Sequence, residues 1–260
     1  MAVGTAGWPA SDEELVGLQR TLGREARTAA EADPWTPAPG AIVGGCFLAY
    51  APGEAGPGRP GDRAWAAAVA WTPSGTIDRR PVDRHLRGGG GHGGPRRSDD
   101  IAGQVVVAGD VPASYVPGLL ARREGPILGA AVALLEPVPD VLLVDATGVD
   151  HPRGAGLAVH LGAVTGIPTV GVTHRPLLAS GAEPDLHRGA TAPVEIEGVL
   201  VGFWVCTRTG TRPVVAHAGW RTTPETAAET VLTASTRAVR TPVPLQEARR
   251  VAREARSLAI

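Results

Sequence analysis

The sequence predicts an α/β protein built on one mixed β-sheet with helices on its faces. Three strand patterns come early in the chain, and helix and strand patterns alternate after them. This order is typical of a sheet that contains antiparallel and parallel neighbours. With 260 residues, 43% of them hydrophobic and 20% charged, the chain can bury a globular core. We find no internal repeat and expect a single domain over residues 1–260, with a Gly-rich insertion loop at 76–100.

The first third of the chain contains one helix and two of the early strands. Ser11 and Glu14 have capping-box spacing, and the helical pattern after them runs to about Asp33. Strands rich in small and apolar residues and bounded by Pro or Gly are expected at 41–50 and 64–71, and a third at 104–109. The insertion before the third strand contains four consecutive glycines, which are costly to order, so we expect a mobile surface loop.

Helices and strands alternate in the rest of the chain. DVLLVD, residues 140–145, is a short apolar run of the kind found in a central parallel strand. Thr223 and Pro224 predict a helix start with Pro in its first position. The remaining elements are expected as a helix at 127–136 with Glu124 near its start, a helix at 157–166, a strand within 167–175, a hairpin at 194–207 turning at Glu197 and Gly198, a strand at 213–219 and a helix at 246–259.

Charge and cysteine content restrict the function classes. The formal net charge is −1, so any nucleic-acid binding must come from local arginine clusters. All 25 basic residues are arginine, which excludes a lysine ammonium from any site. The two cysteines form no CxxC pair and suggest a reducing, cytoplasmic compartment. We expect neither a signal peptide nor a membrane helix, because no segment has the required apolar run.

Candidate chemistry gathers around three stretches. Asp145 ends the DVLLVD strand and is followed by DATGVDHPRGAG, which brings His151 and Arg153 close. A carboxylate, an imidazole and a guanidinium on one loop suggest a metal and phosphate site, although an aspartate there can also be a simple turn former. Glu124 can be a dipole-favoured helix residue, and Tyr115 can be either a packed side chain or an aromatic group presented to bases.

The stretches SYVPGLLARREGP and VLLVDATGVDHPRGAGLAVHLGAVTGIPTVGVTHRPL together resemble the endonuclease V family. The resemblance runs from about Glu13 to about Glu247 and leaves out the insertion. It implies a ribonuclease H-like mixed β-sheet flanked by helices, with hydrolysis of a phosphodiester near deaminated adenine (inosine) by a divalent metal. The implied partner is DNA or RNA that carries the deaminated base, and the implied cofactor is Mg²⁺ or Mn²⁺.

The resemblance also implies roles for individual residues. Asp145 becomes the central metal-binding aspartate and Glu124 the second carboxylate. Tyr115, stiffened by Pro117, matches the wedge tyrosine that separates the strands, with Ser114 where the family usually has proline. Base-pocket positions are Gly118, Gly148, His151 and Gly171. Apart from the resemblance, Arg122, Arg123 and Arg153 are candidate phosphate contacts, although Arg122 and Arg123 can also be solvated surface side chains.

Three matching positions depart from the family pattern. Cys46 in GGCFLAY replaces a metal-binding aspartate, His174 in GVTH replaces a lysine, and Trp220 in HAGWR replaces a histidine. A thiol is soft and normally protonated, whereas Mg²⁺ requires hard oxygen ligands. Loss of a shared carboxylate together with replacement of a lysine and a histidine should lower a two-metal hydrolysis rate by roughly a thousand-fold or more.

Three hypotheses follow from these departures. The first is an altered nuclease in which Asp145 and Glu124 hold a single metal ion. The second is a catalytically silent homologue that binds nucleic acid with a deaminated base, or a partner protein. In the third, Cys46 and His174 join the two carboxylates and hold zinc for different chemistry.

Overall fold

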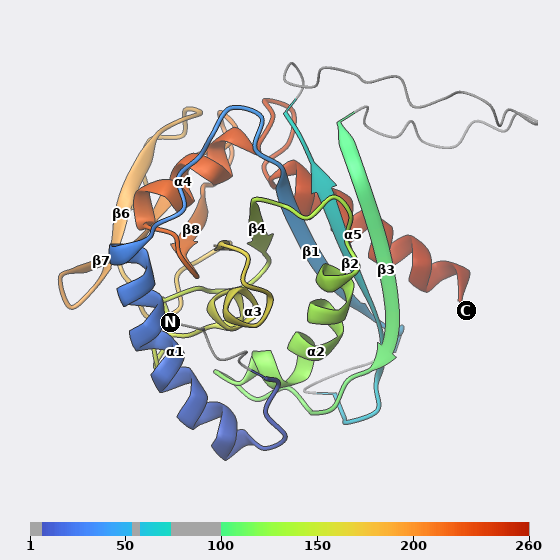
Figure 1. The fold of residues 1–260 in the computed structure, drawn as a ribbon. Helices are drawn as coiled ribbons and strands as arrows, with labels where there is room; N and C mark the ends of the chain where they lie inside the picture. Colours follow the sequence, from blue (N-terminus) through green and yellow to red (C-terminus); the bar gives the residue numbers. More distant parts are fainter. Residues whose placement is uncertain (1–6, 54–57, 74–99, 260) are drawn as a thin grey trace, which may run out of the picture.

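The structure, a computed structural model, describes residues 7–53, 58–73 and 100–259. It contains one eight-stranded sheet in the order β3-β2-β1-β4-β5-β8-β7-β6 (Figure 1). The strands are β1 (Val43–Tyr50), β2 (Arg63–Trp71), β3 (Ile101–Asp110), β4 (Val141–Val144), β5 (Thr169–Thr173), β6 (Thr191–Ile196), β7 (Val199–Val205) and β8 (Val214–Ala218). The helices are α1 (Asp12–Ala32), α2 (Leu120–Ala133), α3 (Leu157–Thr165), α4 (Pro224–Thr233) and α5 (Val243–Leu258). Apart from Asp100, the expected insertion lies outside the described residues.

The sheet is mixed, as the sequence predicts. β1, β2 and β3 form an antiparallel meander, while β1, β4 and β5 are parallel neighbours. β8, β7 and β6 complete the other side with antiparallel pairing. The DVLLVD strand is fully buried near the middle of the sheet, so Asp145 follows a central parallel strand. This is the place where α/β sheets gather ligand chemistry.

Helices cover both faces of the sheet: α1, α2 and α3 lie on one face and α4 and α5 on the other (Figure 1). Side chains alternate along β1, so successive residues enter different cores. Cys46 and Leu48 pack in the cluster formed with α2 and α3, whereas Phe47 and Ala49 pack against α5. This alternation decides which face of the sheet, and therefore which neighbouring side chains, each residue near the end of β1 contacts.

Three local signals in the sequence are confirmed. The Ser11 side chain accepts a hydrogen bond from the backbone N–H of Glu14 and caps α1. Thr223 caps α4 in the same way, with Pro224 in the first position. The β6–β7 hairpin turns through Glu197 and Gly198, both with positive φ, as a tight two-residue turn requires.

The start of α2 was predicted wrongly. We expected an apolar helix at 127–136 with Glu124 near its start, but α2 begins at Leu120 and contains Pro126. A proline in a helix loses one backbone hydrogen bond. Ala121, Ile127 and Leu128 are nevertheless all buried in the main core, which offsets that loss. Glu124 therefore lies in the second turn of α2.

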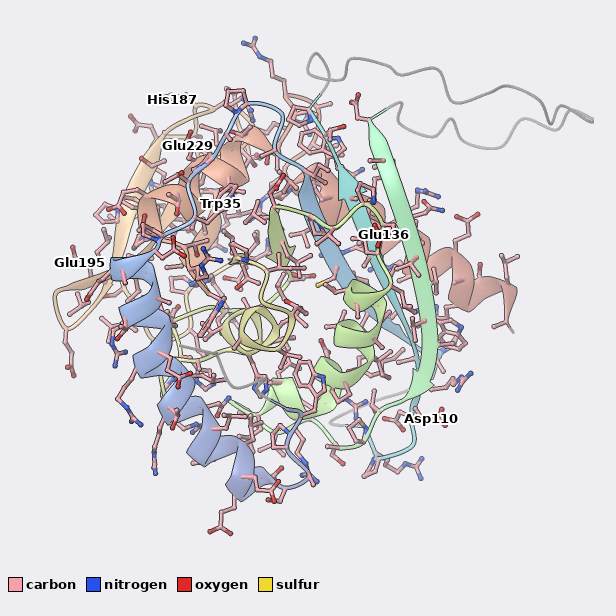
Figure 2. All side chains as sticks on the ribbon, viewed as in Figure 1. Trp35, Asp110, Glu136, His187, Glu195 and Glu229 are labelled. Carbon is pink, nitrogen blue, oxygen red and sulfur yellow. The ribbon has the colours of Figure 1, made fainter. Side chains whose placement is uncertain are left out.

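The two edge strands carry charge at the rim of the molecule. Figure 2 shows Glu195 on β6 and Asp110 at the end of β3 at the outside of the fold. Charged side chains on edge strands oppose pairing with another sheet. Within the described residues, no helix is long and apolar enough to cross a membrane.

Candidate nucleic-acid site

The parallel register of β1 and β4 brings the expected metal-binding positions together. Cys46 pairs with Val144, and Asp145 is the next residue along the chain. Glu124 reaches the same region from α2, since its charge and that of Asp145 both act on the Cys46 thiol. The expectation that Cys46, Glu124 and Asp145 form one centre is therefore consistent with the structure.

Cys46 is an inert member of this centre. Its side chain is only 1% exposed, and its sulfur lies 3.9 Å from the carbonyl oxygen of Leu143. Burial raises the pKa of the thiol strongly, and the negative charges of Asp145 and Glu124 raise it further. The sulfur therefore stays protonated at neutral pH, whereas a metal ligand must be a thiolate.

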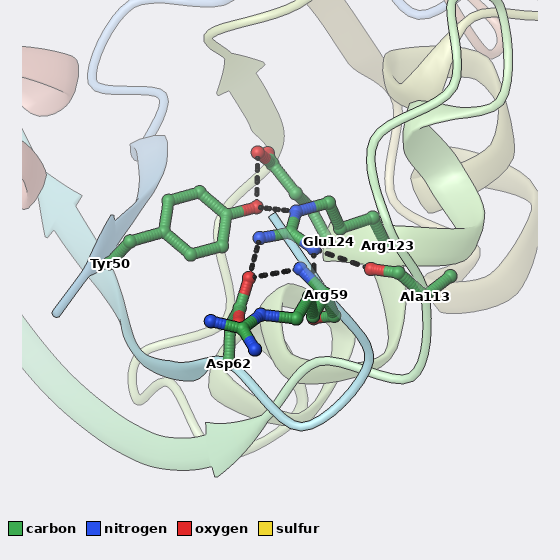
Figure 3. A network of polar contacts seen from close by, with 6 residues as sticks. All are labelled: Tyr50, Arg59, Asp62, Ala113, Arg123 and Glu124. Atoms are coloured by element: carbon green, nitrogen blue, oxygen red, sulfur yellow. Dashed lines mark hydrogen bonds and ion pairs between the residues drawn. The ribbon is translucent and has the colours of Figure 1, made fainter. Parts of the chain in front are cut away.

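Glu124 is held by a short relay of polar side chains. The Tyr50 hydroxyl donates to Glu124 Oε1 at 2.9 Å, and Arg123 Nε donates to the Tyr50 oxygen at 3.0 Å (Figure 3). Burial raises the pKa of Glu124 from 4.5 to about 7, the charge of Asp145 adds to this effect, and the hydrogen bond from Tyr50 opposes it. Without a bound cation, Glu124 is thus partly protonated near neutral pH.

Arg122 and Arg123 are bound to the protein itself. Arg123 is buried, pairs with Asp62 at 2.7 Å and donates to the carbonyl oxygen of Ala113 at 2.5 Å (Figure 3). Arg122 pairs with Asp12 beside α1. These contacts do not support the expectation that the two arginines bind phosphate; they fix α2 and the loop before it.

Asp145 has a cationic partner on α5. Arg249 Nη2 lies 2.8 Å from Asp145 Oδ2, and the guanidinium carbon of Arg249 stands 5.0 Å from the centre of the Phe47 ring. Both members of the pair are about a third exposed or less, at 33% for Asp145 and 27% for Arg249. A guanidinium therefore neutralises the carboxylate that a divalent cation would need.

The centre can offer a divalent metal ion two carboxylates, Asp145 and Glu124, but no third protein ligand from the described residues. Within residues 7–53, 58–73 and 100–259, no three His, Cys, Asp or Glu side chains are arranged to hold one together. Mg²⁺ prefers an octahedral shell of oxygen ligands. The centre offers an ion-paired aspartate, a partly protonated glutamate and a protonated thiol.

The other two substituted family positions, His174 and Trp220, lie in different surroundings. His174 is exposed beyond β5, and burial first, then Arg240, lowers its pKa, while Asp145 opposes this. Trp220 is buried in a hydrophobic cluster with Leu22 of α1 and Val159 of α3. The zinc hypothesis is not supported, because Cys46 and His174 do not join the carboxylates in a metal-binding group.

A pocket of about 230 Å³ lies next to this centre. Its wall combines residues from the Tyr115 loop, the turn after β4 and the end of β5. The residues that carry the argument are Tyr115, Pro117, Gly118, Thr147, His151 and Thr173. Tyr115 is 46% exposed at the rim, as a residue that meets a ligand from outside should be.

The Tyr115 loop is fixed through one carbonyl group. Gly118, with φ of 78°, turns its carbonyl oxygen inward, where it accepts three hydrogen bonds. The donors are Gln19 Nε2 at 3.0 Å, His151 Nε2 at 3.0 Å and Arg153 Nη2 at 2.8 Å. Arg153 also donates to Gln19 at 2.6 Å. The expected phosphate ligand Arg153 is thus engaged in holding the loop.

His151 is a neutral hydrogen-bond donor in this arrangement. Burial lowers its pKa to about 4, and the charge of Arg153 lowers it further. Its Nδ1 accepts from the backbone N–H of Arg153 at 3.3 Å, which leaves Nε2 to donate to Gly118. The expected pocket role of His151 is consistent with this position on the wall.

Gly148 and Gly171 lie behind the pocket. A Cβ at Gly148 would overlap the carbonyl oxygen of Ala218, and one at Gly171 would contact the carbonyl oxygen of Ala146 at 2.5 Å. Both glycines therefore let the turn after β4 pack closely on β5 and β8. Neither glycine lines the pocket itself; the neighbouring residues Ala146, Thr147 and His151 do.

Sequence reasoning missed several supporting residues. Asp150, fully buried, accepts hydrogen bonds from the backbone N–H groups of Leu177, Leu178 and Ala179 and so folds the loop after β5 against the pocket. Gln19 and Arg249 come from helices far away in sequence, and no local signal points to them. Asp150 lies in the DATGVDHPRGAG stretch, so its role near the pocket could have been predicted from that stretch.

The sheet order, with two acidic side chains beside its central strands, defines a ribonuclease H-like α/β protein. A family model described as Endonuclease V matches residues 96–250, more than half of the chain. The chain belongs to the Endonuclease V family. This confirms the family and fold predicted from the sequence.

Individual relatives agree with this assignment. The crystal structure of Endonuclease V from Streptomyces avermitilis is 31% identical, with a TM-score of 0.77, over 98% of this chain and 96% of that one. Curated Endonuclease V sequences from Streptomyces avermitilis and Streptomyces coelicolor are 41% and 40% identical over 47% and 46% of this chain. These matches span about half of each relative, 53% and 52%.

One solved relative was determined with nucleic acid. The Ciona intestinalis Endonuclease V complex contains a 24mer DNA with an inosine followed by a ribo-adenosine. It shares 17% identity and a TM-score of 0.69 over 96% of this chain and all of that one. At this identity the comparison establishes the shared fold.

Proposed function

We propose that this protein recognises nucleic acid carrying a deaminated adenine, with phosphodiester hydrolysis weakened by roughly a thousand-fold or more. The observation that carries the proposal is a contrast between two adjacent sites. The pocket beside Tyr115 is present, and hydrogen bonds to Gly118 hold its loop in place. In the carboxylate centre, by contrast, a protonated thiol stands where a metal ligand is needed, and an arginine lies beside Asp145 where the metal ion would bind.

The chain's own residues can perform recognition. Tyr115 stands at the pocket rim, where it can enter a base stack as the base moves into the pocket. The loop that carries Tyr115 is fixed to α1 and to the turn after β4 through Gly118. A fixed loop loses little conformational freedom on binding, and this favours affinity.

Hydrolysis lacks support in the same region. The family uses a divalent metal ion, and among the described residues the centre retains two carboxylates, Asp145 and Glu124, without a third protein ligand. Arg249 would have to leave Asp145 before a metal ion could approach. The inosine-containing DNA of the Ciona intestinalis complex supports the choice of ligand.

Binding and nicking of one labelled oligonucleotide test the proposal. We expect tighter binding to a strand with inosine than to the same strand with adenine, and nicking with Mg²⁺ or Mn²⁺ at about 0.001 per second or slower. Tyr115→Ala should remove the preference, whereas Tyr50→Phe, which keeps the second aromatic ring, should retain it. Equal binding of the two strands by the wild-type protein would contradict recognition. Efficient nicking would instead support the altered-nuclease hypothesis.

A further inference from the structure

A second hollow, of about 570 Å³, lies on the other side of Tyr115; we call it the α5 groove. β4 pairs with β1 only from Val43 to Cys46, so in the described structure the rest of β1 has no neighbouring strand on that edge. The groove runs along this free edge, with Arg253 and Arg256 of α5 on one side and Tyr115 and the first turns of α2 on the other. The α2 residues that line it include Glu124 of the carboxylate centre. It is therefore a consequence of where the short central strand ends.

α5 presents three arginines toward this region, Arg249, Arg253 and Arg256, which we call the arginine stripe. Their spacings of four and three residues place them on one helix face. The guanidinium carbons of Arg249 and Arg253 lie 5.0 Å and 5.8 Å from the centre of the Phe47 ring. Arg256 Nη1 donates to the carbonyl oxygen of Tyr50 at 3.3 Å. Phe47 and the end of β1 thus orient the stripe.

The charge of the stripe is only partly neutralised. The two glutamates of α5, Glu247 and Glu254, both pair with Arg250, which lies outside the stripe. Arg249 pairs with Asp145. Arg253 is exposed and has no hydrogen bond or ion pair with a described residue, and Arg256 has no carboxylate partner among them. In a chain with net charge −1, Arg253 and Arg256 therefore make a local positive surface on α5, although the carboxyl group of Glu124 also lines the groove and opposes this charge.

The groove is continuous with the base pocket. Tyr115 and Leu120 line both hollows. A strand whose base entered the pocket would have adjacent backbone within reach of the groove. Phosphates there would meet guanidinium groups, which bind phosphate oxygens in pairs and without a metal ion.

We propose that the arginine stripe binds the phosphodiester backbone of a nucleic-acid single strand through Arg253 and Arg256, independently of any metal ion. The proposal rests on the proposed function only for the identity of the base in the neighbouring pocket. Backbone binding itself is independent of sequence and sensitive to salt.

Fluorescence anisotropy of labelled single strands in EDTA tests this inference, with DNA and RNA arms, each with inosine or adenine at the central position. The double variant Arg253→Gln/Arg256→Gln should weaken binding of inosine and adenine strands equally, by about ten-fold near 50 mM salt. The slope of log affinity against log salt should fall by about 1.4, since each phosphate contact on a single strand contributes about 0.7. Binding in either arm supports the inference.

Arg250→Gln is the matched control, because it removes an arginine from the same helix but from outside the stripe. It should bind as the wild type does, and thermal unfolding should show that all variants are folded. The inference fails if the folded double variant keeps the wild-type slope, or if EDTA abolishes wild-type binding. If the double variant has a smaller salt slope but the wild type shows no preference for inosine, the result contradicts the proposed function and leaves the stripe inference intact. If the wild type prefers inosine but the double variant keeps the wild-type salt slope, the result contradicts the stripe inference and leaves the proposed function intact.

Discussion

Cys46 and Arg249 act on the same carboxylate centre from different faces of the sheet. Cys46 packs on the side of α2 and α3, and Arg249 approaches Asp145 from α5. One replaces an oxygen ligand by a protonated thiol, and the other supplies an organic cation beside Asp145. Restoring a single residue should therefore not restore a metal site.

Cys46→Asp tests this point directly. In EDTA the new carboxylate would be buried beside Asp145 and Glu124, and like charges should lower the free energy of unfolding by about 2–4 kcal/mol. Mn²⁺ should recover this loss when Cys46→Asp is combined with Arg249→Gln, but much less in the single variant. Thermal unfolding with and without Mn²⁺ measures the effect.

Cys46→Ser is the control for this prediction, because it changes the side chain without adding charge. It should respond to Mn²⁺ no more than the wild type does. Full Mn²⁺ stabilisation of Cys46→Asp alone would show that Arg249 does not oppose metal binding.

The pH dependence of stability reports on Glu124. Its folded pKa of about 7 lies above the ordinary 4.5, so the native state keeps a proton that the unfolded chain releases between these values. The associated stability is fully present below about pH 4 and is lost as the pH rises through about 7. The amide of Glu124→Gln does not titrate in this range, and its oxygen can still accept the hydrogen bond from the Tyr50 hydroxyl.

The difference in free energy of unfolding between Glu124→Gln and the wild type should shift by roughly 2 kcal/mol in favour of the variant as the pH rises from about 5 to about 8. Urea unfolding at both pH values measures the difference between the two proteins, so that other titrating groups cancel. A difference that does not change with pH would mean that Glu124 titrates normally.

At the scale of elements, the pocket depends on α1 and on the turn after β4 as much as on its own loop. Gln19 and Arg153 meet at the carbonyl group of Gly118, and this joins three segments that are far apart in sequence. The turn can approach β8 because Gly148 has no side chain. Removal of one brace should loosen the loop without unfolding the sheet.

Arg153→Ala should therefore raise hydrogen exchange in residues 113–119, at a cost of about 1–3 kcal/mol in the free energy of unfolding. The inosine preference should fall with it, since the loop would then have to be ordered on binding. Arg24→Ala, which removes a contact within α1 to Thr21, is the control and should leave the loop protected. Unchanged exchange in Arg153→Ala would rule out the bracing role.

At the scale of the whole molecule, the sequence predicts the fold well because its signals are local and mutually consistent. The buried DVLLVD run, the caps at Ser11 and Thr223 and the Glu197–Gly198 turn each specify one element in the correct place. The start of α2 was missed because burial of one helix face outweighs the presence of Pro126.

The site was predictable in part. Cys46, Glu124 and Asp145 could be grouped by resemblance, and the structure places them near one another. The partner of Asp145 could not be predicted, because Arg249 is 104 residues away and only tertiary packing brings it close. The same reason hid Gln19. It also hid the ion pairs of Arg122 with Asp12 and of Arg123 with Asp62, two arginines for which the sequence suggests only phosphate contacts or a solvated surface.

The most direct test of the account is single-turnover incubation of excess protein with an inosine-containing strand, with binding and nicking followed in the same samples in EDTA, Mg²⁺ and Mn²⁺. The account predicts inosine-selective binding of equal strength in all three conditions and nicking at about 0.001 per second or slower, a thousand-fold below the low end of typical enzyme rates. Metal-dependent nicking at a rate typical of enzymes, about 1 per second or more, would contradict it.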